Sequence, residues 1–192
     1  MLYVAITDEQ VEAALLAGAL ACPACSGPLS PWGFARAREL RLRSGTRELT
    51  PRRVRCGGCC RTHVVCPTWS VPRRRDSAEV IGEALRLAAE GVRHRRIAGR
   101  LGRPEGTVRG WLRAARQRAE SLRACATRRI VSLDPEPVAI VPAASSLGDV
   151  IEAIMLAVRA WVLRFGRDDI GPWERAVWLT GGLLHGRPLL PP

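Results

Sequence analysis

Two short cysteine pairs, Cys22-Pro-Ala-Cys25 and Cys56-Gly-Gly-Cys59, limit the folds open to this chain more than any other feature. Thirty residues separate the two pairs. A two-residue spacing on a tight turn presents both sulfurs to one side, and two such knuckles supply the four sulfurs of a tetrahedral zinc site. Extended strands are expected between them, over residues 29–34 and 48–55. The pattern therefore predicts a zinc ribbon, a small β-sheet stabilised by bound Zn²⁺.

The remaining thiols and one histidine leave alternatives for the fourth ligand. Cys60 is adjacent to Cys59, and His63 follows closely, so either could replace one of the four cysteines. His63 is otherwise expected to pack beside the site or to donate a hydrogen bond to it. Cys66 and Cys125 are expected to be small buried residues. A thioredoxin-like redox role for the first pair would need a βαβ context, which the sequence does not predict.

The positive charge of the chain is concentrated in its middle. All 30 basic residues are arginines, and the net charge is +12. Residues 36–75 contribute +10 and residues 76–123 contribute +5. This distribution favours a polyanion partner for the middle of the chain, although a basic surface without such a role is the alternative. No signal peptide or membrane helix is predicted, so a cytoplasmic, nucleoid-associated protein with reduced thiols is expected, with no membrane partner.

Residues 76–123 carry the pattern of three helices. Asp76 and Glu79 are expected to cap a first helix that ends near Gly91. A short second helix follows, then a turn at Gly102-Arg103, and Pro104 suits the start of a third helix. A short glycine-containing turn between the second and third helices is the layout of a helix-turn-helix, in which the third helix enters the major groove of DNA. A basic helical bundle with a solvated arginine face is the alternative.

This arrangement predicts two kinds of DNA contact. The outward positions at the start of the third helix are expected to face base edges. Arginines before and around the second helix are expected to meet phosphates, which adds affinity without sequence information. The predicted base contacts are Glu105, Thr107, Arg109 and Arg113. The predicted phosphate contacts are Arg73, Arg74, Arg75, Arg93, Arg95, Arg96 and Arg103.

The segment IAGRLGRPEGTVRGWLRAAR resembles helix-turn-helix segments of bacterial transposases, and also the promoter-reading domain of sigma factors. Together with CPAC and VRCGGCCRTH, it resembles the N-terminal DNA-binding region of zinc-finger insertion-sequence transposases. It is still more similar to small zinc-ribbon/helix-turn-helix proteins of GC-rich bacteria. The resemblance covers roughly residues 20–120 and implies site-specific DNA binding, with zinc at Cys22, Cys25, Cys56 and Cys59. The sequence departs from that pattern at Cys60, where glycine is expected.

Both ends of the chain are predicted to be helical. Residues 1–20 are expected to hold one helix, followed by the zinc ribbon with its basic strands (21–75) and the helix-turn-helix (76–123). A proline-rich linker is expected over 124–146, followed by a C-terminal helical segment over 147–192. Those last helices are expected either to join the core or to bind a partner, which would be a second copy of the chain or a transposase or integrase.

The fold class expected is therefore mainly α with a small β zinc ribbon. The function expected is sequence-specific binding of double-stranded DNA by a mobile-element accessory or a transcriptional regulator. No catalytic domain and no enzymatic activity are expected, because no strand pattern surrounds the carboxylates after residue 123. The alternatives are a sigma-like promoter reader, a protein-interaction module and, least favoured, a zinc or thiol enzyme.

Overall fold

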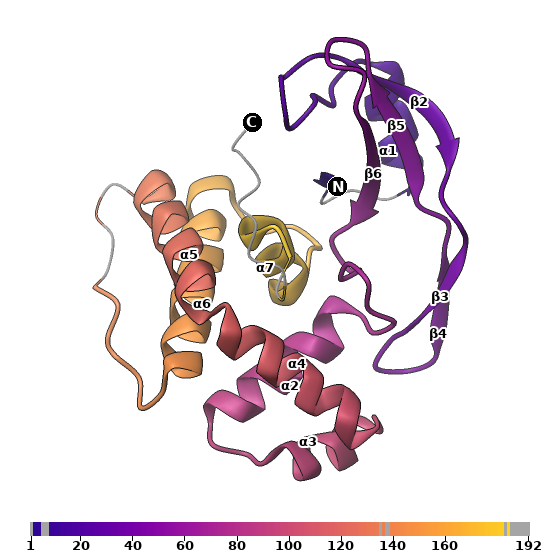
Figure 1. Ribbon diagram of the computed structural model, residues 1–192. Helices are drawn as coiled ribbons and strands as arrows, with labels where there is room; N and C mark the ends of the chain where they lie inside the picture. The colour runs from indigo at the N-terminus through magenta and orange to yellow at the C-terminus, as the bar shows by residue number, and fades with distance from the viewer. Residues whose placement is uncertain (1, 5–7, 135, 137–138, 183, 185–192) are drawn as a thin grey trace.

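The computed structural model describes residues 2–4, 8–134, 136, 139–182 and 184, which form seven helices and six strands. The strands are β1 (Leu2–Val4), β2 (Leu29–Phe34), β3 (Arg38–Arg41), β4 (Thr46–Leu49), β5 (Arg52–Cys56) and β6 (Thr62–Pro67). The helices are α1 (Asp8–Leu16), α2 (Ala78–Ala89), α3 (His94–Leu101), α4 (Glu105–Gln117), α5 (Ala119–Leu133), α6 (Ser146–Phe165) and α7 (Pro172–Thr180). Figure 1 shows the strands as an arm along one side of a helical body. The fold is thus mixed α and β, and among the described helices none is both long and apolar enough to cross a membrane.

A four-stranded sheet in the order β1-β6-β5-β2 forms the upper part of the arm. β5 pairs antiparallel with both β2 and β6, whereas the short β1 pairs parallel with β6. α1 packs across one face of this sheet, and its Val11 and Leu15 are buried with Leu29, Val54 and Val65 in a small core. The cysteine pairs lie at the end of this core, so the metal-site residues and the apolar residues stabilise the same small unit.

The second, two-stranded sheet (β3-β4) forms the lower part of the arm and contacts the helices. Its strands form a hairpin in which Gly45 has a φ of +81°. The backbone of Arg41 accepts a hydrogen bond from the N–H of Ser77, 3.0 Å away, and donates one to the carbonyl of Arg75. These bonds attach the hairpin directly to the start of α2.

α2 ends at Ala89, close to its predicted stop at Gly91, and α3 and α4 lie on either side of the predicted turn at Gly102-Arg103. Ser77 caps α2, its hydroxyl accepting the N–H of Val80, so the predicted capping role of Asp76 is wrong. The carboxylate of Asp76 instead holds two arginines, Arg41 and Arg103. Gly102 ends α3 in the left-handed conformation that glycine adopts without strain, and Pro104 then precedes α4.

The linker expected over 124–146 begins later than the sequence pattern indicated. After a break at Arg118 the chain continues as α5 to Leu133. Leu122, Cys125, Ala126 and Ile130 are buried along one side of this helix. Their spacing of three and four residues is that of a helix face, which explains why the segment is helical until the prolines that begin at residue 135.

The C-terminal helices belong to the main core. Residues of α6 and α7, including Ile154, Ala157 and Val177, are buried in one cluster with residues of α2, α4 and α5. α7 crosses α2 so closely that a Cβ on Gly82 would lie 2.0 Å from the Trp173 ring. Of the two alternatives expected for the C-terminal helices, the packing therefore shows that α6 and α7 join the core.

Candidate metal centre and nucleic-acid interface

The two cysteine pairs lie on separate turns that have the same pattern of backbone hydrogen bonds. The N–H of Ser26 donates to the carbonyl of Cys22, and the N–H of Cys60 donates to that of Cys56. Cys22 and Cys56 each donate in turn to a carbonyl five residues ahead. Ser26 and Cys60, which follow the second cysteine of each pair, have φ angles of +57° and +59°. The knuckles are therefore two copies of one turn, and its last position favours glycine.

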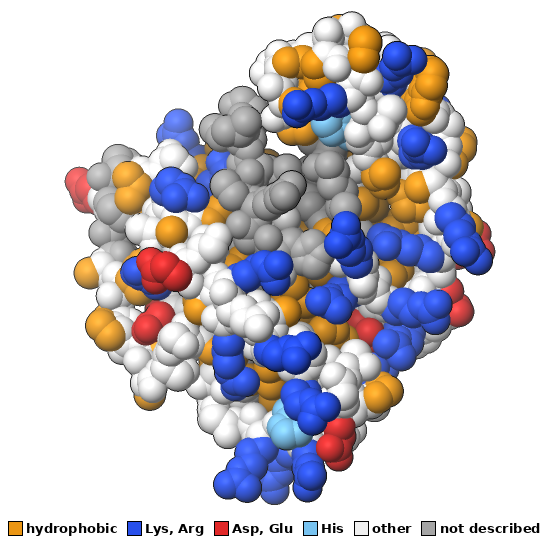
Figure 2. All heavy atoms as spheres, viewed as in Figure 1, with side chains coloured by type: hydrophobic (Ala, Val, Ile, Leu, Met, Phe, Trp, Pro, Cys, Tyr) orange, Lys and Arg blue, Asp and Glu red, His pale blue; other side chains and the backbone are white. Residues whose placement is uncertain are grey.

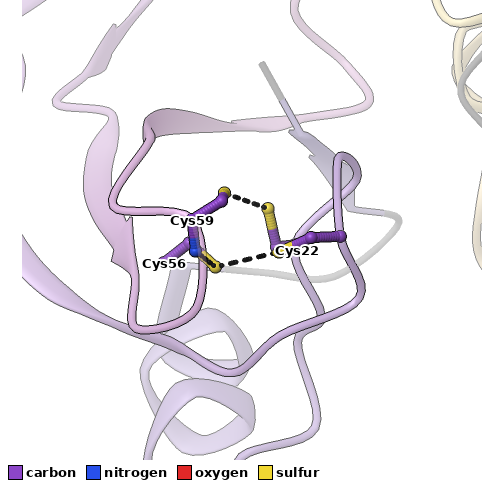
Figure 3. Close-up of side chains that lie close together, drawn as sticks. Cys22, Cys56 and Cys59 are labelled. Carbon is purple, nitrogen blue, oxygen red and sulfur yellow. Dashed lines mark hydrogen bonds between the residues drawn. The ribbon is translucent and has the colours of Figure 1, made fainter.

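The four sulfurs meet between these knuckles. All lie within 4.8 Å of one another, with Cys22 Sγ 3.7 Å from Cys59 Sγ and Cys25 Sγ 3.4 Å from Cys56 Sγ. Figure 3 shows Cys22 on one loop facing Cys56 and Cys59 on the other. A tetrahedral ion with metal–sulfur bonds of about 2.3 Å requires sulfurs about 3.8 Å apart. The spacing therefore fits one four-coordinate metal ion, bound by the cysteines that the sequence indicated.

Small residues allow the sulfurs to approach each other. A Cβ on Gly27 would lie 3.2 Å from the sulfur of Cys56, and one on Gly58 would lie 3.5 Å from the sulfur of Cys25. Backbone N–H groups also point at sulfur: that of Ala24 at Cys22, and that of Cys59 at Cys56. Such N–H groups stabilise thiolates, the form in which cysteine binds metal.

His63 and Cys60, the alternative ligands, occupy different positions. His63 is buried on β6, with Nε2 3.3 Å from the sulfur of Cys22. Burial lowers the pKa of this imidazole, so the ring is neutral near pH 7 and can donate its one N–H to a thiolate. Cys60 is exposed and lies outside the group of four. This arrangement matches the hydrogen-bonding role expected for His63.

Without metal, the thiols of the cluster hold their protons unequally. The backbone N–H of Cys59 is the main cause that lowers the pKa of Cys56 to about 6. The backbone N–H of Gly27 lowers the pKa of Cys25, but hydrogen bonds to the sulfurs of Cys56 and Cys59 outweigh it and raise that pKa to about 12. Before metal binds, these two sulfurs would therefore be a thiolate and a thiol at pH 7.

α4 is anchored by one face and exposes arginines on the other. Val108, Trp111, Leu112 and Ala115 are buried in the main core. Arg109 and Arg113 are exposed one turn apart, as the sequence indicated, and Glu105 is exposed at the start of the helix while Thr107 is half-buried. Glu105 also lies 3.3 Å from the guanidinium of Arg95, so these two residues form a surface ion pair.

One member of this surface was not predicted from the sequence. Arg116 is exposed one turn beyond Arg113 and lines, with Arg93, His94 and Arg109, a hollow of about 270 Å³. The sequence signal that could have identified Arg116 is its spacing of three residues from Arg113, which places both on one face of a helix. Figure 2 shows arginines gathered over the lower part of this face of the molecule, where α3 and α4 lie, with few acidic side chains among them.

The predicted phosphate contacts divide into exposed and internal arginines. Arg73, Arg75, Arg93, Arg95 and Arg96 are exposed, and Arg74 is half-buried. Arg103 differs, because its side chain is only 12% exposed and its Nε lies 2.6 Å from Asp76 Oδ1. It also donates to the carbonyl of Leu42, 2.7 Å away on the β3-β4 hairpin. The outward role predicted for Arg103 is therefore wrong, since its guanidinium is engaged inside the protein.

Residues 22–111 match a family that is described as a domain of unknown function (DUF6431). The match runs from the first cysteine of the cluster to Trp111 in the middle of α4. It therefore includes both knuckles, the β3-β4 hairpin and the start of the exposed arginine face. No curated protein and no solved structure matches the chain.

Proposed function

We propose that this chain is a zinc-stabilised protein that binds specific sequences of double-stranded DNA through α4. The observation that carries the proposal is the two-sided character of that helix. Its apolar side is fixed in the core, while Arg109, Arg113 and Arg116 project from the other side at one-turn intervals. A rigid helix with this pattern of charge suits the major groove of B-DNA.

The connection between α3 and α4 supports a helix-turn-helix interpretation. α3 ends at Leu101, Gly102 turns the chain with a φ of +59°, and α4 begins at Glu105. Arg103 in this turn is tied to Asp76 and Leu42, which fixes the direction in which α4 leaves the turn. In a helix-turn-helix protein, the N-terminal residues of the second helix of the motif contact base edges.

Individual arginines have different roles in the proposed complex. Arg109 and Arg113 pair with guanine, each contributing roughly 1–3 kcal/mol of discrimination against other bases. Glu105 and Thr107 lie at the base-facing start of α4. The phosphates are neutralised by two groups of arginines. These are Arg93, Arg95 and Arg96 at the start of α3, and Arg73, Arg74 and Arg75 before α2.

Zinc is the ion proposed for the cysteine cluster, because four thiolates in a tetrahedral arrangement are its usual structural ligands. A four-sulfur set leaves no coordination position open, so the role proposed for the ion is structural rather than catalytic. When bound, the ion holds the two knuckles together at the end of the ribbon. Elemental analysis of protein purified from cells, with one zinc per chain expected, tests this assignment.

The biological role proposed is that of a transcriptional regulator or an accessory of a mobile element, without a catalytic domain of its own. The proposed contact with a second copy, a transposase or an integrase involves the exposed part of the C-terminal helices. Among the described residues of these helices, Leu163 and Phe165 at the end of α6 are large apolar side chains that are exposed, by 69% and 59%. Size-exclusion chromatography with light scattering tests self-association.

The experiment that tests DNA recognition compares binding of the zinc-loaded protein to mixed-sequence duplex DNA over a range of salt concentrations. Arg109→Ala/Arg113→Ala should weaken binding. Arg93→Ala/Arg96→Ala, at two of the proposed phosphate contacts, should also lower the slope of log K against log salt by about one for each phosphate that is no longer neutralised. Arg128→Ala, a matched control at an exposed arginine of α5, should leave both quantities unchanged. Equal effects of Arg109→Ala/Arg113→Ala and of Arg128→Ala would refute the assignment of α4 as the DNA-binding helix.

A further inference from the structure

The outer face of the ribbon sheet carries an exposed tryptophan and two arginines. Trp32, on the edge strand β2, is 49% exposed, and the guanidinium of Arg55 lies 4.8 Å from its ring centroid. Arg53 is two residues from Arg55 on β5, so it projects from the same side of the sheet, and it is exposed. This group, named here the Trp32 face, consists of Trp32, Arg53 and Arg55.

Burial in a core does not account for the Trp32 face, and Arg55 lies over one side of the Trp32 ring. The opposite side of the sheet packs on α1, and the small core there contains Val54 and Leu29 but not Trp32. Trp32 is also absent from the main helical core. A large aromatic side chain left half in water, at an edge strand that pairs only with β5 among the described strands, is available to a ligand.

The chemistry of this face selects the ligand. Tryptophan offers a flat apolar ring on which a base can stack, and the neighbouring guanidiniums attract a phosphate backbone. Bases in a duplex are already stacked on each other, so only unpaired bases can use the ring. We infer that the Trp32 face binds single-stranded DNA by stacking a base on Trp32, with its phosphates beside Arg53 and Arg55.

This site is separate from the proposed duplex-binding surface. In Figure 1 the β2-β5 part of the ribbon lies at the top of the molecule, whereas α3 and α4 lie in its lower half. The stacking site itself does not depend on α4 reading duplex DNA. The choice of DNA over RNA does rest on the proposed function, because neither tryptophan nor arginine distinguishes the two sugars.

The same strand provides a matched control. Phe34 is 59% exposed and lies 4.3 Å from the guanidinium of Arg52. The charge of Arg52 is, however, paired with Glu12, 2.8 Å away, and Glu48 lines the same hollow. Carboxylates repel a phosphate backbone, so Phe34 should contribute much less to nucleic-acid binding than Trp32.

The test measures the affinity of the full-length, zinc-loaded protein for fluorescein-labelled oligo(dT), oligo(U) and a mixed-sequence duplex. Trp32→Ala should weaken oligo(dT) binding about 5- to 150-fold, the range expected for the loss of one stacked base. Trp32→Phe should retain most of that affinity, and Phe34→Ala should change it less than about 2-fold. Zinc content and Tm of each variant show whether the ribbon remains folded.

The outcomes separate this inference from the proposed function. Loss of duplex binding in Arg109→Ala/Arg113→Ala with oligo(dT) binding retained would support two independent sites. Unchanged oligo(dT) binding in a folded Trp32→Ala variant, or no oligo(dT) binding by the unmodified protein, would overturn the inference whatever the duplex result. Binding of oligo(U) more than about tenfold tighter than oligo(dT) would overturn the assignment to DNA.

Discussion

The carboxylate of Asp76 connects three parts of the molecule, and its replacement by asparagine tests how they are held together. Oδ2 accepts a hydrogen bond from Arg41 on β3, and Oδ1 accepts one from Arg103 in the turn before α4, both at 2.6 Å. Asp76→Asn keeps the shape of the side chain but removes its charge. The arginines would then face an amide, only one atom of which can accept a hydrogen bond.

The magnitude follows from the burial of the partners. The side chains of Asp76 and Arg103 are 2% and 12% exposed, whereas that of Arg41 is 38% exposed. Removing one partner of a buried ion pair costs about 3–5 kcal/mol, because the other charge remains buried without compensation. The more exposed Arg41 pair adds little. For a chain of 192 residues, Tm should therefore fall by about 6–20 °C.

Thermal unfolding followed by circular dichroism, with zinc present, measures this change. Glu79→Gln is the matched control, since Glu79 lies at the start of α2 and its contact with Arg43 is long, at 3.9 Å, and exposed. Its Tm should change by no more than about 4 °C, which corresponds to the 0–1 kcal/mol of a surface pair. A change in Asp76→Asn no larger than that of the control would refute the reasoning.

Three further predictions concern the metal site and the close contact between helices. Cys56→Ser should abolish stoichiometric zinc binding. Cys60→Gly should retain one zinc per chain and raise Tm, because glycine relieves the left-handed conformation of residue 60 at φ +59°. A loss of zinc in Cys60→Gly would contradict this prediction. Zinc binding at pH 7 should release at least one proton, since Cys25 has a pKa of about 12 before metal binds. The affinity for zinc should fall more steeply below about pH 6, where Cys56 also becomes protonated. Calorimetry in buffers of different ionisation enthalpy measures the protons released, and a pH-independent affinity would contradict the prediction. Gly82→Ala should destabilise the protein by about 1–3 kcal/mol, because the added methyl group overlaps the Trp173 ring. Gly99→Ala, at a helical site with open space, should instead stabilise the protein by about 0.5–1 kcal/mol. Urea unfolding measures both changes.

Features that depend on local sequence were predictable. The cysteine pairs identify the four clustered sulfurs, because two-residue spacing forces each pair into a knuckle. Gly102 and Pro104 identify the turn between α3 and α4, because few other residues suit those backbone conformations. The extended segment at 29–34 also corresponds to β2.

Features that depend on distant partners were not predictable in the same way. Asp76 resembles a helix cap in sequence, but its partners Arg41 and Arg103 lie 35 and 27 residues away. The proximity of Gly82 to Trp173 joins α2 to α7 across 91 residues, and no local pattern reports it. The helical extent of α5 is a different case, because the apolar spacing through Ile130 is visible in the sequence of the segment predicted as a linker.

The central claim, that α4 reads a DNA sequence, is tested most directly by selection from a pool of random duplex DNA with the zinc-loaded protein at near-physiological salt. Enrichment of one motif containing guanines is predicted, and Arg109→Ala should relax the preference at one position of that motif by about 5- to 150-fold. A palindromic motif would further indicate two recognition helices about one turn of DNA apart. Retention of DNA without enrichment of any motif would contradict the claim, since the arginines would then bind the backbone alone.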